Sequence, residues 1–221
     1  MREGRPSLVE LVSPGTSALL LVDMQNDFVS PQGKMAEWGF NLSQVQSIVT
    51  SLKRLLDEAR RCGAFVIHTA MINDARQNPL SWYAFWGEPE VALPESWGSQ
   101  HIPELRPLES EVVINKYTYG AFFGTNLDTI LRRKGITTVI VTGTGPNICA
   151  GDTLHQAFAL GYHVIAVSDC LASFSKKGEE FNEQLRAVAM YLVENHYGTV
   201  LTSRELVELW RGRSKCSSKT S

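Results

Sequence analysis

The sequence lacks any apolar run long enough to cross a membrane. The longest run near the N-terminus, Ala18 to Val22, is far shorter than the roughly 20 residues that a membrane-spanning helix needs. The flanking residues typical of a secretory signal peptide are missing as well. We therefore expect a cytoplasmic protein that does not associate with membranes.

An excess of basic residues is also missing. The chain has 21 Lys and Arg against 23 Asp and Glu, which gives a formal net charge of -2. Proteins that bind the phosphate backbone of nucleic acids carry clustered positive charge, so we expect no nucleic-acid partner.

Cysteine is scarce in this chain of 221 residues. It contains four cysteines and no C-x-x-C pair, which excludes a dense disulfide framework and indicates reduced thiols. The four are Cys62, Cys149, Cys170 and Cys216. Cys149 alone lies between a turn rich in Gly and Pro and an amphipathic pattern, and a structural cysteine needs no such setting.

Short apolar runs alternate with helical patterns along the chain. Strands are predicted at residues 17–23, 64–69, 111–116, 137–143, 162–169 and 198–202, and helices at 42–61, 125–134, 148–160, 179–194 and 203–211. This alternation predicts an α/β fold, in which a six-stranded, mostly parallel sheet is covered by helices on both faces. The length predicts one domain over residues 1–211, and the tail 212–221, rich in Ser and Lys, is expected to be disordered.

One long segment, residues 70–110, departs from this alternation. It combines five prolines with several aromatic residues, among them Trp82, Trp86 and Trp97. A long irregular connection within a compact domain is often functional. Two interpretations stay open and are compatible: an aromatic plug that closes one end of the sheet, and a lid over a substrate.

Three chemically active side chains lie where predicted strands end. Asp23 ends the first strand, Lys116 ends the third, and Cys149 follows the fourth. Ligands of open parallel sheets bind at the carboxyl ends of the strands, so the fold can bring a carboxylate, an ammonium and a thiol together. A helix N-terminus and a lysine both favour thiolate, and Asp23 can act as general base.

Each of these residues also has a structural interpretation. A single Asp at a strand end can cap the turn that follows. A single Cys can pack as a small apolar side chain, and a Lys at a strand end is usually solvated.

Three separate blocks of the sequence resemble the isochorismatase-like cysteine hydrolases. They are ALLLVDMQNDF, NKYTYGAFFGTNLDTILRRKGI and VTGTGPNICAGDTLHQAFALGYHVIAVSDC. In the family, the positions of Asp23, Lys116 and Cys149 carry the catalytic triad. The resemblance implies a three-layer α/β/α sandwich of Rossmann type around a six-stranded parallel sheet, and a homo-oligomer, either a dimer or a tetramer.

The resemblance also implies an oxyanion hole and a substrate pocket. The backbone N–H groups of Gly145 and Cys149 would bind the oxyanion, and the family usually has a cis peptide between the positions of Thr144 and Gly145. This chain has Pro146 where the family commonly has Thr, so position 146 can offer no N–H, and the isomers of both Gly145 peptides stay open. In the pocket, we expect Gln25, Phe28, Tyr119 and Trp86 to contact substrate, although Gln25, like Asn26, can equally hold the Asp23 turn, and Tyr119 can merely pack over its turn.

A metal site is not expected. Nicotinamidases of the family carry a D-x-H metal motif after the second strand, whereas Met71 and Asn73 occupy the matching places here. Metal ligands could still come from His68, Asp74 and His101, but a histidine in a strand is more often a core or rim residue whose hydrogen bonds are satisfied.

The cysteine favours one reaction within the family. True isochorismatases generally lack this nucleophile, and a thiol suits attack on an acyl carbon. We therefore expect an amidohydrolase that needs no cofactor and cleaves an amide or ureide C–N bond of a small metabolite through a thioester, with the region from Lys116 to Ile136 most like that of ureidoacrylate and carbamoyl-amide hydrolases. Two alternatives stay open: a metal-assisted hydrolase of nicotinamidase type, and a catalytically silent module that binds a ligand or a partner.

Overall fold

A six-stranded parallel sheet forms the centre of the protein. The computed structural model describes residues 6–88 and 90–217. The strands are β1 (Ser17–Val22), β2 (Phe65–Met71), β3 (Val112–Lys116), β4 (Thr138–Thr144), β5 (His163–Ala172) and β6 (Thr199–Leu201). Their order in the sheet is β3-β2-β1-β4-β5-β6, and every neighbouring pair is parallel. The predicted sheet is confirmed in strand number and direction.

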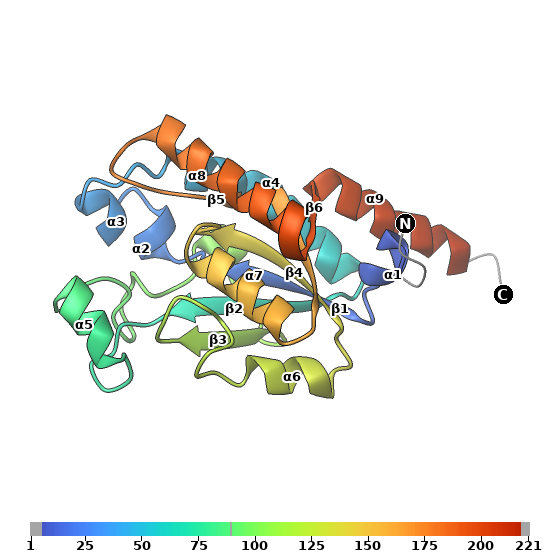
Figure 1. Ribbon diagram of the computed structural model, residues 1–221, viewed down its shortest axis with the longest axis horizontal. Coiled ribbons are helices and arrows are strands. Elements are labelled where there is room, and N and C mark those ends of the chain that lie inside the picture. The colour runs from blue at the N-terminus through green and yellow to red at the C-terminus, as the bar shows by residue number, and fades with distance from the viewer. Residues whose placement is uncertain (1–5, 89, 218–221) are drawn as a thin grey trace.

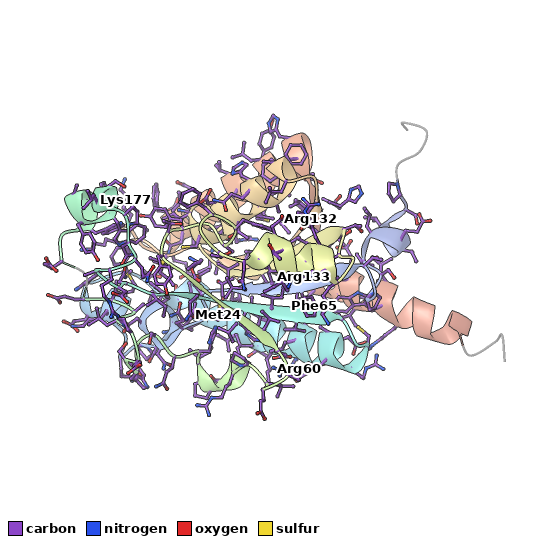
Figure 2. The ribbon with its side chains drawn as sticks, turned by 90° about the horizontal axis from the view of Figure 1, so that it is seen from below. Met24, Arg60, Phe65, Arg132, Arg133 and Lys177 are labelled. Atoms are coloured by element: carbon purple, nitrogen blue, oxygen red, sulfur yellow. The ribbon has the colours of Figure 1, made fainter. Side chains whose placement is uncertain are left out.

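Helices cover both faces of this sheet and complete three layers (Figure 1). One face carries α4 (Ser43–Arg61) and α9 (Ser203–Ser217), and the other carries α6 (Leu127–Arg133), α7 (Cys149–Ala159) and α8 (Glu179–Leu192), which continues as a π-helical turn, η2 (Val193–Tyr197). Figure 2 shows the layers from below, with Arg60 of α4 on the side of the sheet opposite to Arg132 and Arg133 of α6. Because helices cover both faces, β1 is buried along its whole length, and each buried leucine contributes roughly 1.5–3 kcal/mol.

The order of the strands places a topological switch between β1 and β4. The chain leaves β1 toward β2 and β3 on one side, and continues from β4 toward β5 and β6 on the other. The backbones approach closely here, because a Cβ on Gly143 would lie 2.2 Å from the Val22 carbonyl oxygen. Glycine is therefore required at this position, and the crevice beyond the switch is where such sheets bind ligands.

The segment 70–110 divides into two parts with different packing. Its second part contributes Val91, Ala92, Ile102 and Leu105 to the core and includes a 3-10 turn, η1 (Pro103–Leu105). Its first part contains α5 (Leu80–Trp86), in which every side chain is at least partly exposed. The second part thus packs into the core through aliphatic side chains, not through the expected aromatic ones, since Trp97 is half exposed. The first part stands apart at the carboxyl end of the sheet (Figure 1).

Several short helices have no counterpart in the apolar periodicity. These are α1 (Leu8–Leu11), α2 (Asn26–Val29) and α3 (Lys34–Glu37). Each is a single turn, which is too short to show the repeat of apolar residues that identifies a helix in a sequence. At the other end of the chain, α9 runs six residues past its predicted end and through residues 212–217 of the expected tail. Residues 218–221 of that tail lie outside the described residues. Nowhere in the described parts of the chain is there a helix with the length and apolarity to cross a membrane.

Candidate active site

Asp23 is held in an unusual backbone conformation directly after β1. Its φ of 52° lies in the left-handed region, which costs a non-glycine residue about 1–3 kcal/mol. Thr69 on the neighbouring strand β2 compensates this cost, because its hydroxyl donates to Asp23 Oδ1 over 2.6 Å and lies 3.2 Å from the Asp23 N–H. The carboxylate is therefore buried and aimed beyond the end of the sheet.

Lys116 reaches the same carboxylate from two strands away. It is the last residue of β3, its side chain is completely buried, and its Nζ lies 2.7 Å from Asp23 Oδ2. Burial acts to lower the lysine pKa, but the negative charge of Asp23 outweighs it and raises the pKa above its ordinary value. Nζ also donates to the Thr118 carbonyl over 3.2 Å. The interpretation of Lys116 as a solvated strand end is therefore wrong, and the ammonium stays charged at neutral pH.

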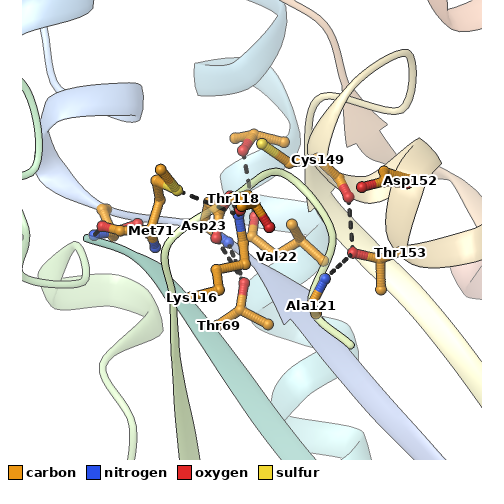
Figure 3. A network of polar contacts seen from close by, with 12 residues as sticks. Val22, Asp23, Thr69, Met71, Lys116, Thr118, Ala121, Cys149, Asp152 and Thr153 are labelled. Atoms are coloured by element: carbon orange, nitrogen blue, oxygen red, sulfur yellow. Dashed lines mark hydrogen bonds and ion pairs between the residues drawn. The ribbon is translucent and has the colours of Figure 1, made fainter. Parts of the chain in front are cut away.

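Cys149 is the first residue of α7 and completes the group (Figure 3). Burial raises the pKa of its thiol to about 12, and the nearby Asp23 carboxylate adds to this effect, while Lys116 opposes it. Lys116 thus favours the thiolate, as expected, but burial and the Asp23 charge outweigh its effect on the thiol pKa. The thiol keeps its proton at rest and needs a base to become nucleophilic, and Asp23 is the carboxylate beside it.

Two sets of hydrogen bonds join the loop after Lys116 to helix α7, which begins at Cys149. The Thr153 hydroxyl of α7 donates to the Cys149 carbonyl over 2.7 Å and accepts from the Ala121 N–H at 3.1 Å. The Gln156 side chain accepts from the N–H groups of Phe122 and Phe123. The loop after Lys116 is thus bound to the helix that begins at Cys149, which fixes the relative positions of the ammonium and the thiol (Figure 3).

The predicted oxyanion hole is only half available. The Cys149 N–H forms no hydrogen bond with any described residue. The Gly145 N–H donates to the Ala172 carbonyl over 2.9 Å as part of the β4–β5 ladder, so the prediction that Gly145 supplies a second free donor is wrong for this structure. Both peptides of Gly145 are trans, and its carbonyl faces the turn, where it accepts from Ile148, Ala150 and Gly151.

A cavity of about 340 Å³ opens above Asp23 and Cys149. Its wall is mainly aromatic, made by Phe28, Trp38, Phe40, Trp82, Trp86, Tyr119 and Phe174. The Trp86 indole donates to the Tyr119 hydroxyl over 3.0 Å, and the rings of Trp82 and Tyr119 lie 4.8 Å apart. Phe28, Tyr119 and Trp86 thus lie where the sequence predicted pocket residues, and α5 forms one wall of the cavity.

The Gln25 side chain binds backbone groups and does not line the cavity. It is fully buried and is not among the described residues that line the wall. Its amide donates to the carbonyls of Met71 and Ser99 and accepts from the Met71 N–H, so both ends of the amide are used. Asn26 likewise donates to the Trp97 carbonyl over 2.8 Å. The predicted substrate contact for Gln25 is therefore wrong, and the alternative, that both residues hold the turn, is confirmed.

Comparison with known proteins agrees with this geometry. The isochorismatase domain matches residues 17–205. The chain belongs to the isochorismatase family. A ureidoacrylate amidohydrolase RutB from Yersinia enterocolitica is 30% identical over 200 residues, which cover 83% of this chain and 84% of that protein. The family predicted from the three sequence blocks is confirmed, and the chain is an enzyme of the hydrolase class.

Solved structures of the isochorismatase family share the fold. A cysteine hydrolase from Pseudomonas syringae pv. phaseolicola superposes with a TM-score of 0.83 at 25% identity, covering 95% of this chain and 99% of that one. An N-carbamoylsarcosine amidase from Thermoplasma acidophilum gives 0.68 at 27% identity, covering 85% and 96%. The predicted α/β/α fold is therefore confirmed.

The possible metal ligands of this isochorismatase-family chain have other partners. His68 Nε2 lies 3.1 Å from a Glu111 carboxylate, His101 Nε2 lies 3.1 Å from the Thr69 carbonyl oxygen, and Asp74 pairs with Arg76. Among the residues that the structure describes, no three His, Cys, Asp or Glu side chains converge as a metal-binding group. The donor set of a nicotinamidase-type metal site does not fit the residues present.

Thr69 is the functional residue that sequence reasoning missed. It lies inside an apolar strand, where a threonine is an ordinary choice for a β-strand. Only the pairing of β1 with β2 brings its hydroxyl to Asp23, so no local signal in the sequence distinguishes it.

Proposed function

We propose that this chain is a cysteine amidohydrolase that cleaves the C–N bond of a small amide or ureide through a thioester, without a metal or other cofactor. The supporting observation is the buried pair of Asp23 Oδ2 and Lys116 Nζ, 2.7 Å apart, together with a cavity that both Asp23 and Cys149 line. The related ureidoacrylate amidohydrolases and the N-carbamoylsarcosine amidase carry names that fit this chemistry.

Acylation begins with proton transfer from the thiol. Asp23 takes the proton as Sγ bonds to the carbonyl carbon, and the C=O electron pair moves onto oxygen. The Cys149 N–H, which is free of other partners among the described residues, binds this oxyanion. The tetrahedral intermediate then collapses, the C–N bond breaks, and protonated Asp23 returns its proton to the leaving nitrogen.

Deacylation uses the same base on water. Asp23 takes a proton from the water that attacks the thioester carbon, the C–S bond breaks, and the thiol is restored as the acid product leaves. Lys116 remains charged throughout, and its ammonium stabilises the carboxylate form of Asp23 and the transient thiolate. This role explains why a lysine is buried completely at this point.

The two alternatives are less well supported. A metal-assisted nicotinamidase mechanism lacks a converging donor set within the described parts of the chain. A catalytically silent module would not require a buried ammonium and carboxylate beside a thiol, because burying charges is costly unless they are paired for a purpose.

The decisive experiment measures ammonia release from a panel of small amides, ureides and carbamoyl compounds in the presence of a chelator. We expect turnover by the wild type and a loss of at least about a thousandfold in Cys149→Ser, because a serine hydroxyl is a much weaker nucleophile in a site built for a thiol. Cys62→Ser is the matched control, since this partly buried thiol lies outside the described cavity wall.

Two results would contradict the proposal. Turnover that disappears with the chelator would indicate a metal-dependent hydrolase. Ammonia release that is equal in wild type and Cys149→Ser would remove the thiol from the mechanism.

A further inference from the structure

The cavity above the catalytic residues has an unusual charge distribution. Its carboxylates belong to Asp23, which is paired with Lys116, and to two glutamates, Glu88 and Glu90. No lysine or arginine is among the described residues that line it. A substrate with a free carboxylate would find no cation in this wall, and an anion that loses its water without a partner is costly.

The remainder of the wall is suited to a positive charge. Trp38, Trp82, Trp86 and Tyr119 surround the cavity together with three phenylalanines. Aromatic faces attract cations, and rings grouped around a pocket are a common way to bind alkylated ammonium groups. The glutamates follow directly after α5, which carries Trp82 and Trp86, so the carboxylates and the rings belong to the same side of the cavity.

An unpaired acceptor in the wall indicates where the ligand places a hydrogen-bond donor. Asn73 lines the cavity and is 3% exposed. Its amide nitrogen donates to the Val91 carbonyl over 2.7 Å, whereas its Oδ1 has no hydrogen-bond partner among the described residues. A buried acceptor without a partner favours a ligand that brings a donor.

Two nearby lysines do not change this balance. Lys34 lies 2.9 Å from Glu37 and 3.8 Å from Glu90, so an acidic partner already accompanies it. Lys176 places its Nζ over the ring of Phe40, 5.2 Å from the centroid, and is not among the described wall residues.

From the aromatic wall and the two glutamates, we infer that the substrate is an amide or ureide whose non-reacting part carries a positively charged, alkylated ammonium group and no carboxylate, and whose N–H groups supply the donor that Asn73 Oδ1 lacks. This inference rests on the proposed function, since it names the substrate class of the same site. The inferred substrate differs from those named for two relatives, ureidoacrylate and N-carbamoylsarcosine, both of which contain a carboxylate.

The test uses three acetamides that differ only in one group. Trimethylammonioacetamide carries the cation, tert-butylacetamide is its neutral isostere, and malonamate carries a carboxylate. Their dissociation constants are measured on Cys149→Ser by tryptophan fluorescence, which reports on Trp38, Trp82 and Trp86 of the wall without hydrolysis. We expect the ammonium compound to bind more than about threefold tighter than its neutral isostere, as cation–π contacts predict, and malonamate to bind most weakly.

Variants assign the preference to particular residues. Glu88→Gln combined with Glu90→Gln should reduce the advantage of the ammonium compound, whereas Glu109→Gln, at an exposed site outside the described wall, should leave it unchanged. An ammonium advantage of threefold or less, or malonamate binding as tightly as tert-butylacetamide, would overturn the inference. If malonamate binds best and loses affinity in Lys176→Gln, Lys176 is the counter-ion of an anionic substrate.

The same compounds separate this inference from the proposed function. Ammonia release by the wild type from any amide supports the amidohydrolase, whatever the order of binding. A cationic preference in binding without ammonia release from any amide would refute the amidohydrolase and leave the charge selectivity of the cavity established.

Discussion

At the scale of single residues, the protonated thiol is the most consequential feature of the site. Burial raises the pKa of Cys149 to about 12 with Asp23 beside it, so the resting enzyme holds thiol and carboxylate together. In the mechanism that we propose, the thiol becomes a nucleophile when substrate arrives and the proton moves to Asp23, and until then it is protected from side reactions that need thiolate.

This protonation state predicts slow alkylation. The rate at which iodoacetamide modifies Cys149 should keep rising with pH through the alkaline range, because the thiolate fraction grows as pH approaches about 12. Lys116→Met should slow the reaction further, because the ammonium lowers the thiol pKa. Mass spectrometry of the peptide that contains Cys149 measures both rates. A plateau near neutral pH in the wild type would contradict the protonated resting state.

Thr69 is predicted to act as a positioning residue. Thr69→Val keeps the shape of the side chain but removes the 2.6 Å hydrogen bond to Asp23 Oδ1, so kcat should fall about 10- to 100-fold with little change in KM. Thr69→Ser should restore most of the activity because it restores the hydroxyl.

The matched control for Thr69 is Thr142→Val on β4. Thr142 is equally buried, and its hydroxyl donates to the Leu20 carbonyl instead of the catalytic carboxylate. Equal kcat losses in the two valine variants would mean that Thr69 acts on stability alone.

At the scale of elements, α4 and α9 are joined through one carboxylate. Glu58 on α4 accepts from Arg211 of α9 over 3.0 Å and from Arg61 one turn along its own helix. These hydrogen bonds, followed by the positive charges, lower the Glu58 pKa to about 2. The carboxylate side chain is almost fully buried, so the pairing is more than an exposed ion pair.

Replacing this carboxylate should loosen the contact between the two helices. Glu58→Gln is expected to lower the free energy of unfolding by about 1–2 kcal/mol, because it loses hydrogen bonds between charged groups. Glu208→Gln, which removes an exposed pair with Arg204 within α9, should cost less than about 0.5 kcal/mol. Denaturant titrations compare the two, and equal losses would show that the link between helices contributes nothing special.

The helices and strands themselves were largely predictable. The six strands begin and end within three residues of their predicted bounds, because strands buried on both faces are continuous apolar runs. The division of segment 70–110 into two parts could not be predicted, because its second part belongs to the same core cluster as residues of α4 and β2 that are remote in sequence.

At the scale of the whole molecule, stability depends on buried titratable groups between the layers. Glu111 binds Arg60 of α4 at 2.8 Å and His68 of β2 at 3.1 Å. Burial opposes the charged form of Glu111, yet the hydrogen bonds from Arg60 and from the Leu108 N–H lower its pKa to about 2. Burial, together with neighbouring His101, lowers the His68 pKa to about 4.

These shifts all have the same sign, so acid should destabilise the fold in two stages. The unfolded chain protonates His68 below its ordinary pKa of 6.5, whereas the folded protein resists protonation down to about 4. The carboxylates of Glu58 and Glu111 have an ordinary pKa of 4.5 and a folded pKa of about 2. The free energy of unfolding is therefore highest above pH 6.5 and falls as pH drops toward 2.

Urea titrations across this pH range test the prediction. His68→Gln should flatten the pH dependence between 6.5 and 4 and leave the lower window intact. A wild-type stability that is constant between pH 7 and pH 4 would contradict it.

The predicted dimer or tetramer also belongs to this scale and stays a prediction. The exposed side chains of Val188, Tyr191 and Leu192 on α8 are a natural first place to look for its interface.

The sequence by itself determined the family and the parallel sheet, and it predicted the three residues Asp23, Lys116 and Cys149 as a triad. Apolar runs, helix stops and the three family blocks are contiguous in the chain, so they can be read without a structure. Phe28, Trp86 and Tyr119, which were predicted to contact substrate, line the cavity, and the contact itself stays a prediction.

Only the tertiary structure decided what each polar group does. The Gly145 N–H donates to a strand carbonyl and not toward the cavity. The Gln25 amide donates to two backbone carbonyls of other segments. Burial kept the proton on Cys149, and strand pairing delivered Thr69 to Asp23. Hydrogen bonds and pKa values depend on the distance, direction and solvent exposure of groups that are remote in sequence, and these quantities exist only in the folded chain.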